Sequence, residues 1–323
     1  MRLPAFLRPP PPLPPPGVGE GVDTRELLRR VRRIELRTRR LVDTVFGGEY
    51  HSVFRGQGIE FAEVRPYHPG DDVRTIDWNV TARTGTPHVK KHVEERELSV
   101  LLAVDMSASE AFGTRERFKA ERAAEVAAVL ALSAVRNNDR VGLVLFTDSV
   151  EHVVPPRKGR RHALRLIRDL LAFRPAGRGT DMAGGLDYAA RLLAHRGVLF
   201  LVSDFVTEHP GGSATLAAWE RSLRIASRRH DVVAVRITDP AENVLPDVGL
   251  LALRDPESGR ETVVDSSNAA VRNAYAAALA EDGAVRRQLF RRLAVDEIDI
   301  ATDGPLARPL LAFFRRRERQ RIR

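Results

Sequence analysis

Apolar runs alternate with helix-periodic segments over the last two thirds of the chain. The runs predict strands at 99–104, 141–146, 150–155, 198–202, 232–237 and 297–301. The periodic segments predict helices at 115–136, 159–173, 181–195, 214–230, 268–293 and 305–319. Continuous runs of Val, Leu and Ile are typical of parallel strands that are buried on both faces. We therefore expect an α/β fold with a doubly wound, mostly parallel sheet and helices on both faces.

Three other segments have patterns of their own. The segment 250–264 predicts a hairpin bent at 256–259, and Gly, Pro and alternating residues over 50–97 predict short strands and a hairpin with little helix. Leu27, Val31, Ile34, Leu41 and Val45 recur at near-helical spacing, interrupted by Thr38, and the opposite face is rich in Arg. This pattern predicts a surface helix that rests on the main body.

These patterns divide the chain into five parts. We expect a disordered proline-rich arm at 1–22, an Arg-rich amphipathic helix at 23–46, a small β-rich module at 47–97, the α/β domain at 98–304, and a C-terminal helix with a basic tail at 305–323.

Composition narrows the class of protein. The 323 residues include no Cys, which excludes disulfides, thiol catalysis and thiolate metal sites. No apolar run reaches about 18 residues and the start has no signal-peptide pattern, so we expect a cytoplasmic protein without a membrane span.

The net charge of +9 is concentrated at the ends of the chain. Residues 23–45 carry eight Arg against four acidic residues, and residues 315–323 carry six Arg against one Glu. The rest of the chain is close to neutral. The charge leaves nucleic-acid or anionic-surface binding through the Arg-rich ends as an alternative function. It is less favoured, since no aromatic residues interleave with the Arg residues.

Oxygen-bearing side chains follow two predicted strands and precede one helix. Asp105, Ser107 and Ser109 form a D-x-S-x-S sequence after the first strand of the α/β domain, Thr180 lies in G-T-D before a helix, and Asp204 follows the strand 198–202. The carboxyl ends of parallel strands share one edge of a sheet, so these residues are expected to meet. Hydroxyl and carboxylate oxygens suit Mg²⁺ or Mn²⁺. A simpler interpretation is that Asp105 only caps the following helix.

The spacing of these residues resembles the metal-ion-dependent adhesion site (MIDAS) of von Willebrand factor A domains, over about residues 97–304. The resemblance implies that Ser107, Ser109 and Thr180 ligate the ion directly, with Asp105 and Asp204 close by, partly through waters. It also implies that the sixth position of the ion takes a Glu or Asp side chain from a partner protein.

A second resemblance involves the sequences F-R-G-Q-G-I-E-F at 54–61, V-R-P-Y at 64–67 and P-G-D-D-V-R-T-I-D-W at 69–78. They are similar to the signature of the bacterial family of domain of unknown function 58, whose members carry a von Willebrand A domain next. That family implies a MoxR-type AAA+ ATPase as partner and an adaptor or chaperone-like role toward a client that the sequence does not name.

Within this signature, Asp71, Asp72 and Asp77 are open to two interpretations. They could form an acidic cluster, but salt bridges to neighbouring Arg residues and capping of turns are favoured. Tyr67 and Trp78 are expected to be packing residues. His88 and His92 could bind zinc only on a helix, and an extended segment is expected there instead.

An enzyme is the third function considered. The sequence has no G-x-x-x-x-G-K-[ST] phosphate loop, no H-E-x-x-H and no G-x-S-x-G. A metal-dependent hydrolase is therefore less favoured than a non-enzymatic binding protein.

Overall fold

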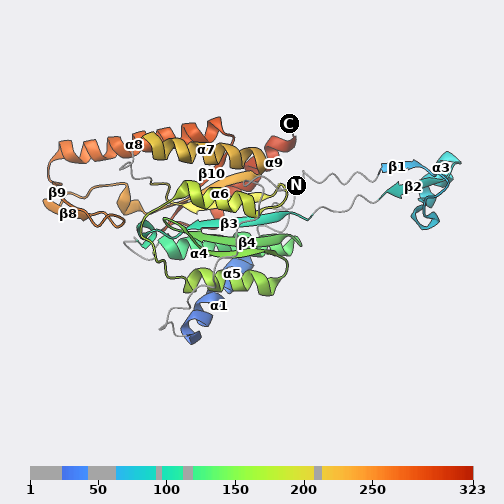
Figure 1. Ribbon diagram of the computed structural model, residues 1–323, viewed down its shortest axis with the longest axis horizontal. Coiled ribbons are helices and arrows are strands. Elements are labelled where there is room, and N and C mark those ends of the chain that lie inside the picture. Colours follow the sequence, from blue (N-terminus) through green and yellow to red (C-terminus); the bar gives the residue numbers. More distant parts are fainter. Residues whose placement is uncertain (1–23, 43–62, 92–96, 112–118, 207–212, 323) are drawn as a thin grey trace, which may run out of the picture.

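A six-stranded sheet forms the centre of the molecule. The computed structural model describes residues 24–42, 63–91, 97–111, 119–206 and 213–322 (Figure 1). The strands are β3 (Ser99–Asp105), β4 (Arg140–Phe146), β5 (Val150–Arg157), β6 (Val198–Ser203), β7 (Asp231–Thr238) and β10 (Asp296–Ala301), in the order β10-β7-β6-β3-β4-β5. Only the edge strand β5 is antiparallel to its neighbour. The predicted doubly wound, mostly parallel sheet is confirmed.

The strand order reverses beside β3. The chain runs from β3 outward to β4 and β5, and then returns to the other side of β3 with β6. The carboxyl ends of β3 and β6 therefore lie at the topological switch point, where open α/β sheets bind their ligands.

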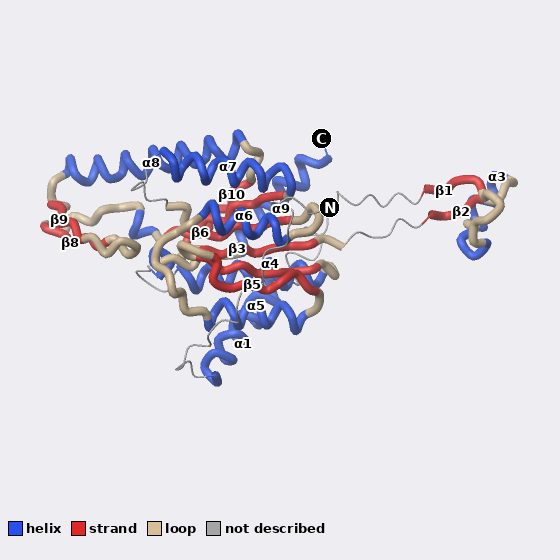
Figure 2. The backbone as a smooth tube through the Cα atoms, in the orientation of Figure 1, coloured by secondary structure: helices blue, strands red, loops and turns tan. Residues whose placement is uncertain are grey.

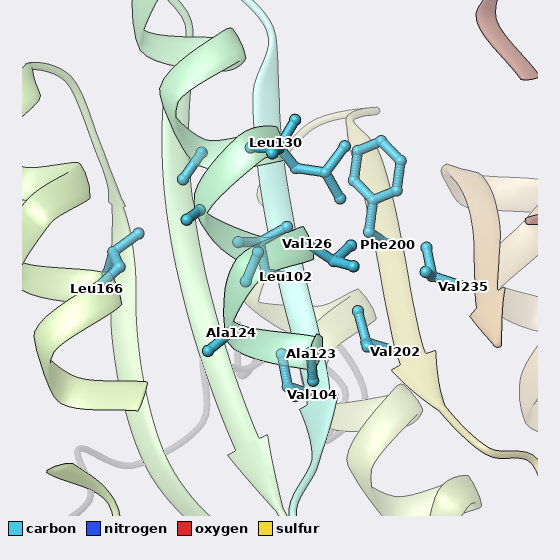
Figure 3. Close-up of a cluster of buried hydrophobic side chains, with 14 of the residues drawn as sticks. Leu102, Val104, Ala123, Ala124, Val126, Leu130, Leu166, Phe200, Val202 and Val235 are labelled. Carbon is cyan, nitrogen blue, oxygen red and sulfur yellow. The ribbon is translucent and has the colours of Figure 1, made fainter. Parts of the chain in front are cut away.

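Helices cover both faces of the sheet, as Figure 2 shows. One face packs against α1 (Thr24–Leu41), α4 (Lys119–Arg136), α5 (Arg160–Ala172) and α9 (Ala307–Ile322). The other packs against α6 (Met182–Leu192), α7 (Ser213–Arg229) and α8 (Ala269–Arg292). Strand β3 contributes Leu102 and Val104 to the first cluster, and Leu101 and Ala103 to the second. Figure 3 shows Leu102 near Val126 of α4 and Val104 near Ala123 of the same helix. Both faces are apolar because alternate residues of a strand point to opposite sides.

Helix α1 rests on the body, as its pattern predicted. Val31 and Val42 are buried, and Ile34 packs against the core. Thr38 is also buried without breaking the stripe, because its hydroxyl donates to the Ile34 carbonyl at 2.7 Å. The Arg-rich face contributes as well: Arg37 bonds Glu125 of α4 at 3.2 Å. Val45 lies outside the described residues.

The small module differs from its prediction in one element. Its described part pairs β1 (Glu63–Pro66) antiparallel with β2 (His88–Lys91), and between them lie the 3₁₀ helix η4 (Val73–Thr75) and the short helix α3 (Trp78–Thr84). Helix α3 was not expected. It is too short for a periodic signal, and it is defined by its ends: Asp77 accepts the Asn79 and Val80 amides, and Gly85 follows at a φ of 71°.

The acidic residues of the module have the structural roles that were favoured. Asp71 accepts two hydrogen bonds from Arg65, at 2.8 and 2.6 Å, and this guanidinium lowers the pKa of Asp71. Asp72 caps η4. The expectation that Trp78 packs is wrong, because Trp78 is 69% exposed at the first turn of α3.

The hairpin predicted after β7 is confirmed as β8 (Leu250–Arg254) paired with β9 (Glu261–Asp265). It forms a sheet of its own, separate from the central sheet. Within the described residues, no helix is long and apolar enough to cross a membrane.

Candidate metal centre

Asp105 ends β3 and is the most buried acid of the predicted site, with 1% of its surface exposed. Its Oδ1 accepts the Ser107 amide at 2.9 Å, and its Oδ2 accepts the Ser203 hydroxyl at 2.8 Å. Burial raises the pKa of Asp105 to about 7, and the nearby charge of Asp204 acts in the same direction, while the hydrogen bonds oppose them. The protein therefore holds this carboxylate where its charge is unfavourable.

The hydroxyls come from two loops that are fastened together. Ser107 Oγ and Ser109 Oγ lie 3.1 Å apart at the start of the 3₁₀ helix η5 (Ala108–Ala111). The Ala108 amide donates to the Arg178 carbonyl at 3.0 Å, which ties this loop to the loop that contains Thr180. That second loop is fixed in turn to the end of β4, because the Asp181 amide donates to the Thr147 carbonyl at 2.7 Å.

Asp204 follows β6 and is paired with a buried lysine. Its Oδ1 accepts the Val206 amide at 2.9 Å, and its Oδ2 accepts Lys119 Nζ at 2.9 Å. Lys119 is completely buried in the first turn of α4 and also forms an ion pair with Glu242. The lysine thus balances part of the negative charge behind the site.

Sequence reasoning missed Lys119, although a signal was present. Lys119, Ala123 and Val126 are separated by four and three residues, so the lysine lies on the buried face of its helix. A Lys in such a position needs an acidic partner.

Glu257, in the turn between β8 and β9, was also missed. The Thr180 hydroxyl donates to Glu257 Oε1 at 2.7 Å, and the Ser107 side chain lies close enough to lower the pKa of Glu257. Partial burial raises the pKa of Glu257, and the charge of Asp204 adds to this effect. Nothing in the sequence around Glu257 connects it with residues so far away in the chain.

The five predicted residues are linked in steps: Asp105 contacts Ser107, Ser107 contacts Ser109, and the loop of Thr180 is bonded to the Ser107 loop. The charge of Asp204 acts on Asp105 and on Glu257, which accepts the Thr180 hydroxyl. The chemistry of this donor set fits a hard divalent cation, since every candidate ligand is a hydroxyl or carboxylate oxygen. Among the described residues, no group of three or more His, Cys, Asp or Glu side chains could hold a metal. An ion in this part of the chain would therefore depend on the hydroxyls, and its binding stays a prediction.

The structure adds little support for a zinc site at His88 and His92 or for binding through the basic tail. The Nδ1 of His88 lies 2.7 Å from the Thr86 carbonyl, and His92 lies outside the described residues. Part of the basic tail is used inside the chain, where Arg317 forms ion pairs with Asp231 and Asp296 at 2.6 and 2.5 Å.

Strand order and helical layers define a doubly wound α/β domain with a mostly parallel sheet. The family model described as protein of unknown function DUF58 matches residues 63–285, and the chain belongs to this family. The match begins in the small module and ends within α8, so the family sequence includes every residue of the candidate site.

Similar proteins match either most of the chain or about a third of it. The uncharacterized protein Rv1480 of Mycobacterium tuberculosis is 34% identical over 310 residues, which cover 94% of each chain. The uncharacterized protein YeaD of Bacillus subtilis is 28% identical over 109 residues, 34% of this chain and 25% of YeaD.

Among solved structures, BatB from Bacteroides thetaiotaomicron is similar with a TM-score of 0.43 and 16% identity, covering 69% of this chain and 98% of BatB. The von Willebrand factor type A protein from Catenulispora acidiphila has a TM-score of 0.34 and 16% identity, covering 47% of this chain and 34% of that protein.

Proposed function

We propose that this protein is a non-enzymatic adaptor that binds a partner protein through a divalent metal ion, Mg²⁺ or Mn²⁺. The observation that carries the proposal is the meeting of Ser107, Ser109 and Thr180 with the buried Asp105 and Asp204 at the switch point of the sheet. No single element could place these groups together; the β3 and β6 ends and the Thr180 loop each contribute.

The donor set favours an ion that keeps most of its positive charge and can therefore bind an acidic side chain of a partner protein. Ser107, Ser109 and Thr180 would hold the ion with neutral oxygens, and Asp105 and Asp204 would lie behind them. A bound ion supplies Lewis acidity toward a carboxylate oxygen. Asp105 is oriented by Ser107 and Ser203, and Asp204 by Val206 and Lys119, so the chain fixes both acids before any ion arrives.

The partner that we propose is a MoxR-type AAA+ ATPase, with a client protein of unknown identity. This part of the proposal rests on the resemblance of the 54–78 signature to a family that works with such ATPases. An acidic side chain of the ATPase or the client would complete the coordination of the ion.

The test is co-purification of the tagged full chain with a MoxR-type ATPase from its own cells, in Mg²⁺, in EDTA and with Asp105→Ala. We expect capture that needs both Mg²⁺ and Asp105. Asp77→Ala is the matched control, because Asp77 accepts a similar backbone hydrogen bond outside the site.

Capture that survives both EDTA and Asp105→Ala would contradict a role for the ion. The absence of this ATPase from every sample would contradict the proposed partner. Mn²⁺ titration of the purified chain tests the ion site separately, and Ser107→Ala should weaken Mn²⁺ binding while the exposed Ser267→Ala should not.

A further inference from the structure

The hairpin β8–β9 places one acidic side chain against the candidate ion ligands. Glu257 accepts a hydrogen bond from the Thr180 hydroxyl at 2.7 Å, and the Ser107 side chain lies close enough to act on its carboxylate. These are two of the three hydroxyls that would ligate the ion. The carboxylate therefore lies where an incoming acidic side chain would have to lie to reach the same ion.

The turn that carries Glu257 is built to present it. Asp255 Oδ1 accepts the Glu257 amide at 3.0 Å, and the Asp255 amide donates to the Arg260 carbonyl at 2.9 Å across the base of the turn. Gly259 supplies the left-handed residue, at a φ of 71°, that closes the turn. Pro256 and Ser258 on either side of Glu257 are exposed, whereas Glu257 itself is half-buried.

The rest of the hairpin is weakly held. Leu250 is 77% exposed and Val263 is 65% exposed, and no strand of the central sheet pairs with β8 or β9. A two-stranded hairpin alone is marginally stable in water. Its tip contact at Glu257 can therefore be exchanged without dismantling the core.

We propose that Glu257 is an internal ligand of the ion, which occupies within the same chain the position that an acidic side chain of the partner takes. This inference rests on the proposed function, because it assumes the ion site. Partner binding then requires the tip of the hairpin to move away from the ion. The stability of the closed hairpin therefore determines how much partner is needed for binding.

Two consequences follow from one carboxylate. A tethered ligand acts at an effective concentration on the order of millimolar, so it competes with a free partner at lower concentration. The apparent affinity for the partner is the intrinsic affinity multiplied by the fraction of chains whose hairpin is open, so it is low when few hairpins are open. Glu257 also adds a charged oxygen to a set of neutral hydroxyls, so the resting chain holds the ion more tightly than an open one.

The test uses Mn²⁺ alone as the probe, with the full chain as wild type, Glu257→Gln and the control Glu261→Gln. Glu261 is an exposed acid on the same hairpin. Mn²⁺ affinity is measured by electron paramagnetic resonance, and the water on the bound ion by proton relaxation. We expect Glu257→Gln to weaken Mn²⁺ binding by about tenfold or more and to admit one more water, because the ion loses a charged ligand.

Hydrogen exchange of residues 250–265 gives an independent readout. Mn²⁺ should slow exchange in the wild type and in Glu261→Gln, but not in Glu257→Gln. If Mn²⁺ binds the wild type through Ser107 and Glu257→Gln changes neither affinity, hydration nor exchange, the internal ligand is overturned and the ion site stands. If Mn²⁺ does not bind the wild type at all, both proposals are overturned.

Discussion

Aspartates in the small module and in the candidate metal centre accept the same local hydrogen bond, yet only the second region forms a candidate binding site. Asp77 Oδ1 accepts the amide two residues ahead at 3.0 Å, and Asp105 Oδ1 does so at 2.9 Å. The second oxygens differ, because that of Asp105 accepts Ser203 from another strand. In the module, Asp77 caps a helix of seven residues, whereas Asp105 is buried at the end of β3, an inner strand of the sheet.

The comparison shows that aspartates near one another in sequence form a candidate binding site only when distant segments of the chain bury them. Asp71 is satisfied by Arg65, six residues away, and remains near solvent. Asp204 is satisfied by Lys119, 85 residues away, and both side chains are almost fully buried. The module stabilises its own turns, while the centre holds charges that the fold has to compensate.

The largest effect should come from removing the buried compensating charge. Lys119→Met leaves Asp204 and Glu242 without their lysine, so we expect the free energy of unfolding to fall by about 3–5 kcal/mol in EDTA. Urea denaturation measures it. Lys158→Met is the matched control, since Lys158 pairs with Glu97 at the surface and should leave the midpoint nearly unchanged. An equal loss of unfolding free energy in both variants would contradict the claim that the buried lysine stabilises the fold more than the surface lysine does.

A smaller effect of opposite sign is expected at Asp105. Asp105→Asn removes a buried charge that faces Asp204, so the protein in EDTA should become more stable, by about 1–3 kcal/mol at pH 8. Differential scanning calorimetry with and without Mg²⁺ measures this. Mg²⁺ should stabilise the wild type and not the variant. A destabilised variant in EDTA would mean that the hydrogen bonds from Ser107 and Ser203 outweigh the cost of the charge.

The smallest effect should be confined to the module. Asp77→Ala removes the cap of α3 and should cost about 1 kcal/mol of local stability. Hydrogen exchange of residues 78–84 should speed up, with Mn²⁺ affinity unchanged. Weaker Mn²⁺ binding in this variant would show that the two regions are coupled.

The sequence predicted the sheet because apolar runs such as that of β3 are long, and it predicted the meeting of the site residues because strand ends share an edge. It could not predict Glu257, whose contact with Thr180 spans 77 residues and depends on how the hairpin folds back. Helix α3 was missed for the opposite reason: its capping signals are local, but its seven residues make only about two turns, too few for a repeating apolar spacing to show.

The position of α1 has a consequence for how the chain can be shortened. The chain enters the module from α1 and leaves it into β3, and both of these elements belong to the body. The module is therefore an insertion rather than a removable leading domain. A chain that began at residue 97 would lack α1 and would leave an uncovered apolar strip along α4 and α5, with Glu125 deprived of Arg37. Separating the two regions calls for a short linker that replaces the module and spares the helix before it.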